Sequence, residues 1–181
     1  MRRKPGDSVG PLRLRSIEGA LFDLDVLRGT RVLLAFFRFA ACPFCNLRVH
    51  ELVSRFDELG GRLTVVAIFD SPLDNLRHQA DRHRAPFPIL ADETNAYYRA
   101  FAIERSIVGM FKAAFLRFPS VLRAMLLKGF LPSSFQGRLT TLPAEFLVDE
   151  QGVIREAYYG KDIGDHLPFE QVKAFALGEA R

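Results

Sequence analysis

The only two cysteines of the chain, Cys42 and Cys45, are separated by Pro43 and Phe44 and lie where an apolar run gives way to a helical pattern. Two thiols with this spacing at the first turn of a helix can close a disulfide with little movement of the backbone. The amide groups at a helix N-terminus also favour a thiolate there. The spacing therefore predicts a redox-active dithiol, with Pro43 fixing the first helical turn.

A metal site is the alternative for paired cysteines, but a tetrahedral zinc site needs four ligands. The chain has no second cysteine pair. We therefore expect no metal and no cofactor other than the dithiol itself, which an external thiol would reduce. Cys42 is expected at the exposed end of the helix as the nucleophile, with Cys45 as the resolving thiol, and either a disulfide or a peroxide would oxidise the pair.

Two nearby side chains are candidates for tuning the dithiol. Arg38, four residues before Cys42, either faces the thiol and lowers its pKa or points to solvent from an alternating strand position, and the sequence leaves both open. His50 lies about two turns beyond Cys42 and is expected at the surface, without a catalytic role.

The length and composition indicate a single domain over residues 1–181. The chain is 49% hydrophobic, which suffices for one sizeable core. Its basic start, Met1 to Lys4, is followed by Pro5-Gly6-Asp7-Ser8 where a signal peptide would be apolar, so we expect a cytoplasmic protein. Two cysteines in that setting argue against a structural disulfide framework.

The elements that position the dithiol are a strand, a helix and a second strand. Residues 31–39 are continuously apolar and rich in aromatics, which predicts a central buried strand that ends at the cysteines. Apolar residues then recur at helical spacing until Gly60-Gly61, and residues 64–69 form a second buried strand. The short connection predicts parallel strands and a right-handed crossover.

The rest of the chain adds short elements around this unit. The patterns predict a hairpin within residues 5–30, a helix from Ser71-Pro72 to about Arg84, a strand at 86–90, a helix at 92–102, an antiparallel hairpin of 142–149 with 153–159, and a closing helix at 168–177. The predicted order is βαβα, a linking segment, then ββα.

Residues 104–138 form a basic and apolar insertion that is expected to be helical. No acidic residue lies between Glu104 and Glu145, whereas six basic residues do. Extra core, a lid, a partner-binding surface and a contact with a membrane surface all remain open, with extra core or a lid favoured. The uncharged runs are shorter than the roughly 20 residues of a spanning helix, and the sparse charge argues against nucleic-acid binding.

This order of elements resembles the thioredoxin fold, and more closely the peroxiredoxin-like branch of the alkyl hydroperoxide reductase and thiol-specific antioxidant family. The segments that carry the resemblance are Pro5–Val9 with Ser16–Gly19, Phe87–Asp92, and Phe146–Asp149 with Gly152. The resemblance implies an α/β, thioredoxin-like fold with an N-terminal hairpin extension and a helical insertion before the C-terminal ββα unit.

The chain departs from a typical peroxiredoxin at three positions. The family's proline and threonine ahead of the peroxidatic cysteine are replaced by Ala35 and Phe39, and its active-site arginine by Pro143. Thioredoxins place a cis-proline at that last position, so the resemblance implies that Pro143 is cis and holds the backbone of Leu142 open to a substrate chain. The chain also lacks the buried carboxylate of thioredoxins, since Phe36 takes its place.

These features leave three hypotheses, in order of preference. The first is a thiol-disulfide oxidoreductase that reduces disulfides through Cys42 and Cys45, because the residues that activate peroxide are absent. The second is a thiol-dependent peroxidase that passes through a Cys42 sulfenic acid. The third is a redox-inert binding module that uses the basic insertion. For the first two, the resemblance implies a thioredoxin- or glutathione-type reductant.

Overall fold

The predicted central strand is β3 (Arg31–Phe37), whose side chains are almost entirely buried. The structure, a computed structural model, describes residues 1–80, 84–104 and 140–179. Strand β3 pairs in parallel with β4 (Leu63–Phe69), and α1 (Pro43–Ser54) connects the two. The strand–helix–strand unit expected from the sequence is therefore confirmed.

The described strands form one seven-stranded sheet in the order β2-β1-β5-β4-β3-β6-β7. On one side of the central pair lies β5 (Ile89–Ala91), parallel to β4, followed by the antiparallel hairpin of β1 (Arg13–Ser16) and β2 (Leu21–Asp23). On the other side lies the predicted hairpin of β6 (Ala144–Val148) and β7 (Ile154–Tyr159). Both hairpin predictions are confirmed.

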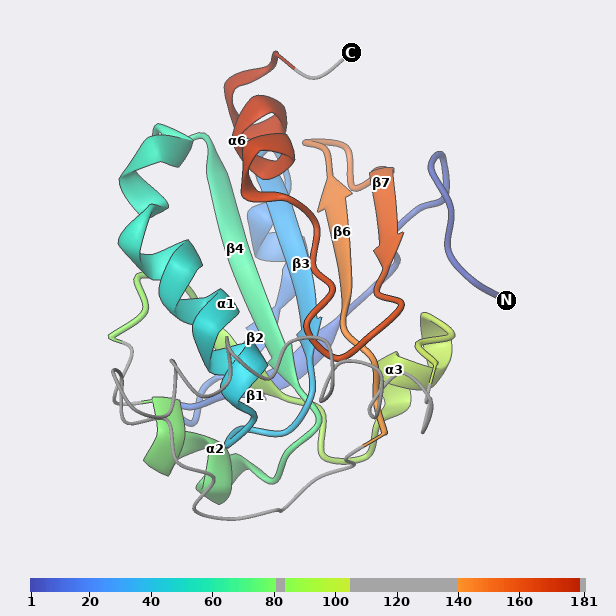
Figure 1. Cartoon of the computed structure of the whole chain (residues 1–181). Helices are drawn as coiled ribbons and strands as arrows, with labels where there is room; N and C mark the ends of the chain where they lie inside the picture. Colours follow the sequence, from blue (N-terminus) through green and yellow to red (C-terminus); the bar gives the residue numbers. More distant parts are fainter. Residues whose placement is uncertain (81–83, 105–139, 180–181) are drawn as a thin grey trace.

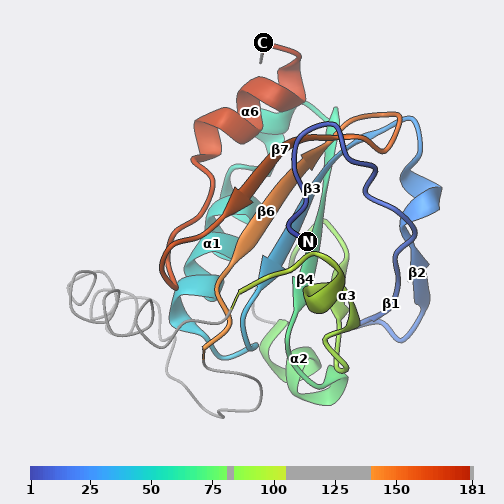
Figure 2. The ribbon, with the colours of Figure 1, turned by 90° about the vertical axis from the view of Figure 1, so that its right-hand side faces the viewer.

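Helices cover both faces of the sheet. Figure 2 shows α1 and α6 (Phe169–Leu177) on one face and α3 (Ala96–Ala100) on the other. Helix α2 (Leu73–Ala80) lies beside the end of the sheet at which the N-terminus of α1 also lies (Figure 1). Short 3-10 turns at Leu24–Leu27 and Phe56–Leu59 complete the described elements.

The alternation of side chains along the strands divides the core into two layers. Leu33, Ala35 and Phe37 of β3 face α1 and α6, whereas Leu34 and Phe36 pack against Tyr98 and other aromatic residues on the opposite face. Both cysteines belong to the first layer. The dithiol is thus built into the core under α1 rather than into a surface loop.

Several boundaries differ from the sequence prediction, and two predictions reach beyond the described residues. Strand β3 ends at Phe37 rather than at residue 39, because the chain turns there toward α1. Strand β5 begins at Ile89 rather than at residue 86, and α3 covers Ala96–Ala100 rather than 92–102. Helix α2 is described to Ala80, and residues 81–83 lie outside the described part of the chain, so its expected end near Arg84 stays a prediction. The insertion predicted at 104–138 lies, apart from Glu104, outside the part of the chain that the structure describes, so its helical character stays a prediction.

Candidate active site

The dithiol lies at the junction of β3 and α1. Cys42 is the N-cap of α1 with an extended backbone, and Pro43 occupies the first helical position. The amide of Cys42 donates to the carbonyl of Phe39 at 3.0 Å, which closes a turn after the strand. A proline is tolerated at this position because the first amides of a helix have no partner within the helix. This turn places the Cys42 sulfur against the free amides of the first helical turn.

Cys42 is fully buried, with 0% of its surface exposed. The expectation that it lies at an exposed helix end is therefore wrong. The reason is packing around the turn, since Phe39 and Phe44 are only 3% and 8% exposed and belong to the same core layer. A substrate reaches this sulfur only when the surrounding side chains move.

The pKa of Cys42 is nevertheless lowered, to about 6. Burial by itself raises the pKa of the thiol. Its effect is outweighed by the hydrogen bond from the Cys45 thiol, the positive charge of Arg38, and the backbone amides of Cys45 and Phe44. Cys42 is thus the sulfur that the site holds as a thiolate near neutral pH.

Cys45 has the opposite character. Burial raises the pKa of this thiol well above its ordinary value, and so do its hydrogen bond to Cys42 and the negative charge of Cys42. Its sulfur also accepts a hydrogen bond from the backbone amide of Arg38 at 3.4 Å. Both cysteines are free thiols in this structure. The pair is therefore a reduced dithiol with one proton held mainly by Cys45.

Arg38 faces the dithiol rather than solvent. Its side chain leaves the end of β3 inward, the residue is 3% exposed, and Nη1 lies 3.4 Å from the sulfur of Cys42. The guanidinium also lies over the ring of Phe39, with 5.2 Å to the ring centroid. Of the two orientations that the sequence leaves open, the structure has the one in which the cation faces the thiol.

Leu142 and Pro143 lie immediately before β6, but not in the arrangement that the thioredoxin resemblance implies. The peptide bond between them is trans, so the expectation of a cis-proline is wrong. The amide of Leu142 donates to the carbonyl of Glu104, and the carbonyl of Pro143 accepts from Gly160. The amide of Leu142 is thus already engaged, and a substrate-binding role for the two residues stays a prediction.

A buried charge network lies one turn further along α1. Arg48 makes a bidentate contact of 2.9 Å with Glu145 of β6 and also donates to Glu51 and to the carbonyl of Leu167. Glu145 accepts in addition from the amide of Leu167 and faces Nδ1 of His166 at 3.2 Å. Although burial raises the pKa of Glu145, the charge of Arg48 and the contact with His166 lower it to about 2.

No local sequence pattern identifies this network. The one signal for it is a glutamate inside the apolar run of β6, where a buried carboxylate needs a partner. The partners themselves are 97 and 21 residues away in sequence, so no local pattern relates them. His50, by contrast, is exposed, as expected.

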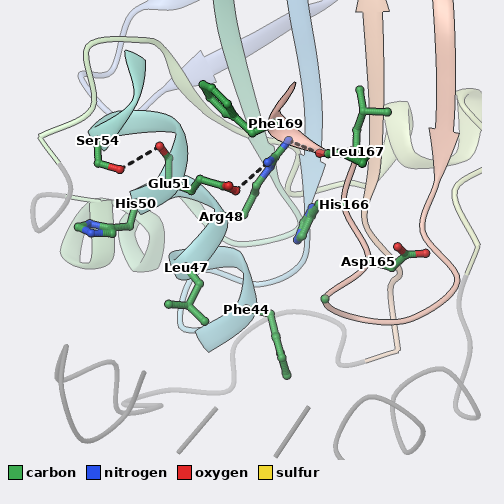
Figure 3. A pocket seen from close by; sticks show the side chains of 12 residues that line it. Phe44, Leu47, Arg48, His50, Glu51, Ser54, Asp165, His166, Leu167 and Phe169 are labelled. Carbon is green, nitrogen blue, oxygen red and sulfur yellow. Dashed lines mark hydrogen bonds and ion pairs between the residues drawn. The ribbon is translucent and has the colours of Figure 1, made fainter. Parts of the chain in front are cut away.

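The network borders a cavity of about 560 Å³ between α1 and the segment before α6. Figure 3 shows Phe44, Leu47 and Arg48 on α1, with His166 on the segment before α6 across from them. Phe44 is the residue between the two cysteines and lines this cavity. Neither cysteine is among the residues that line it.

The described residues contain no cluster of three or more histidine, cysteine or acidic side chains that could hold a metal ion. Within the same parts of the chain, no helix is long and apolar enough to cross a membrane. The reactive groups of the described site are the thiols of Cys42 and Cys45.

A buried dithiol at the junction of a central strand and helix, in a sheet of this order, defines a thioredoxin-like protein. The model of the AhpC/TSA family matches residues 5–157, which is most of the chain. The chain therefore belongs to the AhpC/TSA family, and the resemblance inferred from the sequence is confirmed. A comparison with curated proteins found no match.

Solved structures with this fold include both peroxidases and a thiol:disulfide interchange protein. Peroxidoxin BcpB from Mycobacterium tuberculosis is 17% identical, with a TM-score of 0.72 over 99% of this chain and 100% of that one. A thiol peroxidase from Chromobacterium violaceum is 14% identical, with a TM-score of 0.68 over 98% and 88%. A putative thiol:disulfide interchange protein DsbE from Chlorobium tepidum is 15% identical, with a TM-score of 0.65 over 99% of both chains. These likenesses show the thioredoxin-like fold.

Proposed function

We propose that the protein is a thiol-disulfide oxidoreductase that reduces disulfides by cycling Cys42 and Cys45. The observation that carries the proposal is that the pKa values of the two thiols are shifted in opposite directions. The pKa of Cys42 is lowered to about 6, whereas that of Cys45 is raised. A thiolate is the attacking species in exchange, and a neighbouring protonated thiol is held ready for the second step.

The electrons of the reaction balance within the two sulfurs and the substrate. The Cys42 thiolate attacks one sulfur of the substrate disulfide, whose S–S bond breaks to release the first thiolate, and a mixed disulfide forms at Cys42. Cys45 then loses its proton and attacks the Cys42 sulfur, which releases the second thiolate. The substrate gains two electrons, its two thiolates take one proton from Cys45 and one from solvent, and the enzyme ends as the Cys42–Cys45 disulfide.

Three residues that differ from the family pattern support disulfide reduction as the first choice. A peroxide substrate needs polar groups that stabilise the breaking O–O bond. At the positions where the family carries proline, threonine and arginine, this chain has Ala35, Phe39 and Pro143. All three side chains are apolar and buried. They offer no hydrogen bond to a peroxide.

Peroxide reduction is the second candidate, and the position of Arg38 favours it. Its guanidinium lies 3.4 Å from the Cys42 sulfur, where it replaces the missing family arginine as a cation. The thiolate would attack one peroxide oxygen, release water or an alcohol, and become a sulfenic acid. Cys45 would then form the disulfide with loss of water. The redox-inert binding module rests on residues 104–138 and stays a prediction.

Turnover needs an external dithiol or thiol to reduce the Cys42–Cys45 disulfide. We propose a thioredoxin- or glutathione-type reductant, in line with the general chemistry of the AhpC/TSA family.

The test mixes the reduced protein with bis(2-hydroxyethyl) disulfide and, separately, with hydrogen peroxide. Protein thiols are counted by mass spectrometry over time, and turnover is followed with a thioredoxin or a glutathione reducing system. We expect faster oxidation by the disulfide than by the peroxide, and loss of both reactions in Cys42→Ser. Faster oxidation by peroxide would favour the second candidate. Activity that survives in Cys42→Ser would overturn both.

A further inference from the structure

The hydroxyl of a buried tyrosine reaches the strand end at which the turn to the dithiol begins. Tyr98 belongs to α3, on the face of the sheet opposite α1 (Figure 2), and is only 3% exposed. Its hydroxyl donates to the carbonyl of Phe37, at the end of β3, and lies 3.0 Å from the carbonyl of Ile68 in β4. A phenol has a single proton, so the two carbonyls share it. These contacts bring a group from the opposite face of the sheet to the peptide that follows β3.

The peptide group between Phe37 and Arg38, called here the 37–38 peptide, joins Tyr98 to the dithiol. Its carbonyl accepts the hydrogen bond from Tyr98, and its N–H donates to the sulfur of Cys45 at 3.4 Å. Hydrogen bonds in such a chain polarise one another, which strengthens each bond by about 10–30%. Donation by the hydroxyl therefore makes this N–H a stronger donor to Cys45.

The two groups of Arg38 that face the dithiol contact different sulfurs. The guanidinium lies 3.4 Å from the sulfur of Cys42, whereas the backbone N–H donates to Cys45. A change at Tyr98 acts on the backbone group and leaves the guanidinium in place. Such a change should therefore alter Cys45 much more than Cys42.

Cys45 is the thiol whose anion needs stabilisation. Burial, the hydrogen bond to Cys42 and the negative charge of Cys42 raise its pKa, whereas the charge of Arg38 and the hydrogen bond from the Arg38 amide lower it. Once Cys42 has formed a mixed disulfide, its negative charge is gone, but the cost of burying a second thiolate remains. Cys45 must then lose its proton to attack, and a hydrogen bond to the anion favours that loss.

The hydroxyl of Tyr98 keeps its proton. Burial and the negative charges of Asp70 and Asp92 raise the pKa of this phenol well above its ordinary value. Asp70 accepts from Asn95 at 2.8 Å and from Thr141 at 2.9 Å, and Asp92 accepts from the first amides of α3. Both carboxylates are thus engaged with other donors. The hydroxyl therefore remains a donor to the 37–38 peptide while Cys45 titrates.

We propose that the Tyr98 hydroxyl, acting through the 37–38 peptide, strengthens the hydrogen bond from the Arg38 amide to Cys45 and so stabilises the Cys45 thiolate in the resolving step. In that step the thiolate attacks the sulfur of Cys42, the bond between Cys42 and the substrate sulfur breaks, and the substrate leaves as a thiolate that takes up the proton of Cys45. Tyr98 is a positioning residue for this step. The proposal deepens the oxidoreductase function and rests on it for the existence of a resolving step.

The test follows the two steps of the reaction separately with 4,4'-dithiodipyridine. Attack by Cys42 releases one half of the reagent as 4-thiopyridone, and attack by Cys45 on the mixed disulfide releases the other half. A stopped-flow absorbance trace then has two phases, of which the second should be absent in Cys45→Ser. The rate of the second phase is recorded against pH over the range in which the protein stays folded.

Tyr98→Phe removes only the hydroxyl and should shift the second phase. We expect its pH midpoint to rise by about 0.5 unit. Below the midpoint the variant should be about twofold slower than wild type, because less of Cys45 is ionised. On the alkaline plateau it should be at least as fast, because a thiolate of higher pKa is the better nucleophile. The first phase should keep its midpoint near pH 6, the pKa of Cys42.

Two further variants separate this effect from damage to the fold. Tyr97→Phe is the matched control on the same helix, because the hydroxyl of Tyr97 accepts from the amide of Arg13 in β1 at 2.8 Å and should leave both phases unchanged. Should Tyr98→Phe fail to fold, 3-fluorotyrosine is placed at position 98 instead. It has nearly the same shape and a stronger O–H donor, so the midpoint of the second phase should fall.

The outcomes distinguish this inference from the function on which it rests. Equal midpoints in Tyr98→Phe and wild type, a rate that is lower at every pH, or a midpoint that does not fall with 3-fluorotyrosine overturns the inference even if the protein turns over disulfides. The expected shifts without turnover of bis(2-hydroxyethyl) disulfide would support the role of Tyr98 and overturn the proposed function. Absence of a second phase in wild type overturns both.

Discussion

The guanidinium of Arg38 lies 3.4 Å from the sulfur of Cys42, and both residues are almost completely buried. A buried cation and a buried thiol stabilise each other only when the thiol is ionised. The contact therefore links the protonation of Cys42 to the inward orientation of Arg38. Several measurable properties of the dithiol depend on it.

The reactivity of Cys42 should follow an acidic titration. Because the thiolate is the nucleophile, its alkylation rate rises with pH as the proton leaves, and a pKa of about 6 places the half-maximal rate near pH 6. An ordinary cysteine would reach half of its maximal rate at about pH 8.5. The measurement is the rate of iodoacetamide modification against pH, with the modified cysteine identified by mass spectrometry. A midpoint above about pH 8 would contradict the geometry described here.

Replacing Arg38 by methionine should move that midpoint upward. The loss of a cation beside a thiolate raises its pKa by about 1–3 units, so the rate of alkylation at pH 6 should fall at least several-fold. Arg38→Lys is the matched control because it keeps the charge, and it should retain most of the shift. Coinciding pH profiles for wild type and Arg38→Met would mean that the contact has no influence on Cys42.

Replacing Cys45 by serine should trap the first step of the reaction. With no resolving thiol, the mixed disulfide between Cys42 and the substrate accumulates instead of being released. We expect intact-mass spectra of Cys45→Ser treated with bis(2-hydroxyethyl) disulfide to show one added 2-hydroxyethylthio group. Cys42→Ser is the control and should show no such species, since the pKa of its remaining thiol is raised by burial. Accumulation in Cys42→Ser instead would reverse the assigned roles.

The ion pair of Arg48 and Glu145 should matter for stability. Arg48→Met leaves the Glu145 carboxylate buried without its cation, which is expected to lower the free energy of unfolding by about 3–5 kcal/mol. Arg13→Met is a control, because its ion pair with Asp23 is exposed and should contribute little to stability. Urea unfolding measures both.

The same pair predicts how stability depends on acid. The pKa of Glu145 is about 2 in the folded protein and about 4.3 for an unperturbed glutamate, so the contribution of this carboxylate to the free energy of unfolding is present above about pH 4.3 and is lost as the pH falls through 2.

A double variant, Arg48→Met with Glu145→Gln, should be less destabilised than the sum of the single variants. Strict additivity would show that the two side chains do not interact.

The sequence alone was sufficient for the order of elements and for the location of the dithiol. Apolar runs, helical spacing and turn residues are local signals, and they predicted the β3–α1–β4 unit, both hairpins and the closing helix α6. The spacing of Cys42 and Cys45 likewise predicted a pair at the start of a helix. These features depend on residues that are close together in the chain.

Only the tertiary structure decided what surrounds the dithiol. The inward turn of Arg38, the burial of Cys42 and the trans bond before Pro143 could not be inferred from local spacing. Nor could the contact between Arg48 and Glu145, which are 97 residues apart, or the position of His166 beside them. Such contacts arise when α1, β6 and the segment before α6 pack on one face of the sheet. Their free energies depend on burial and on partners that lie far apart in sequence.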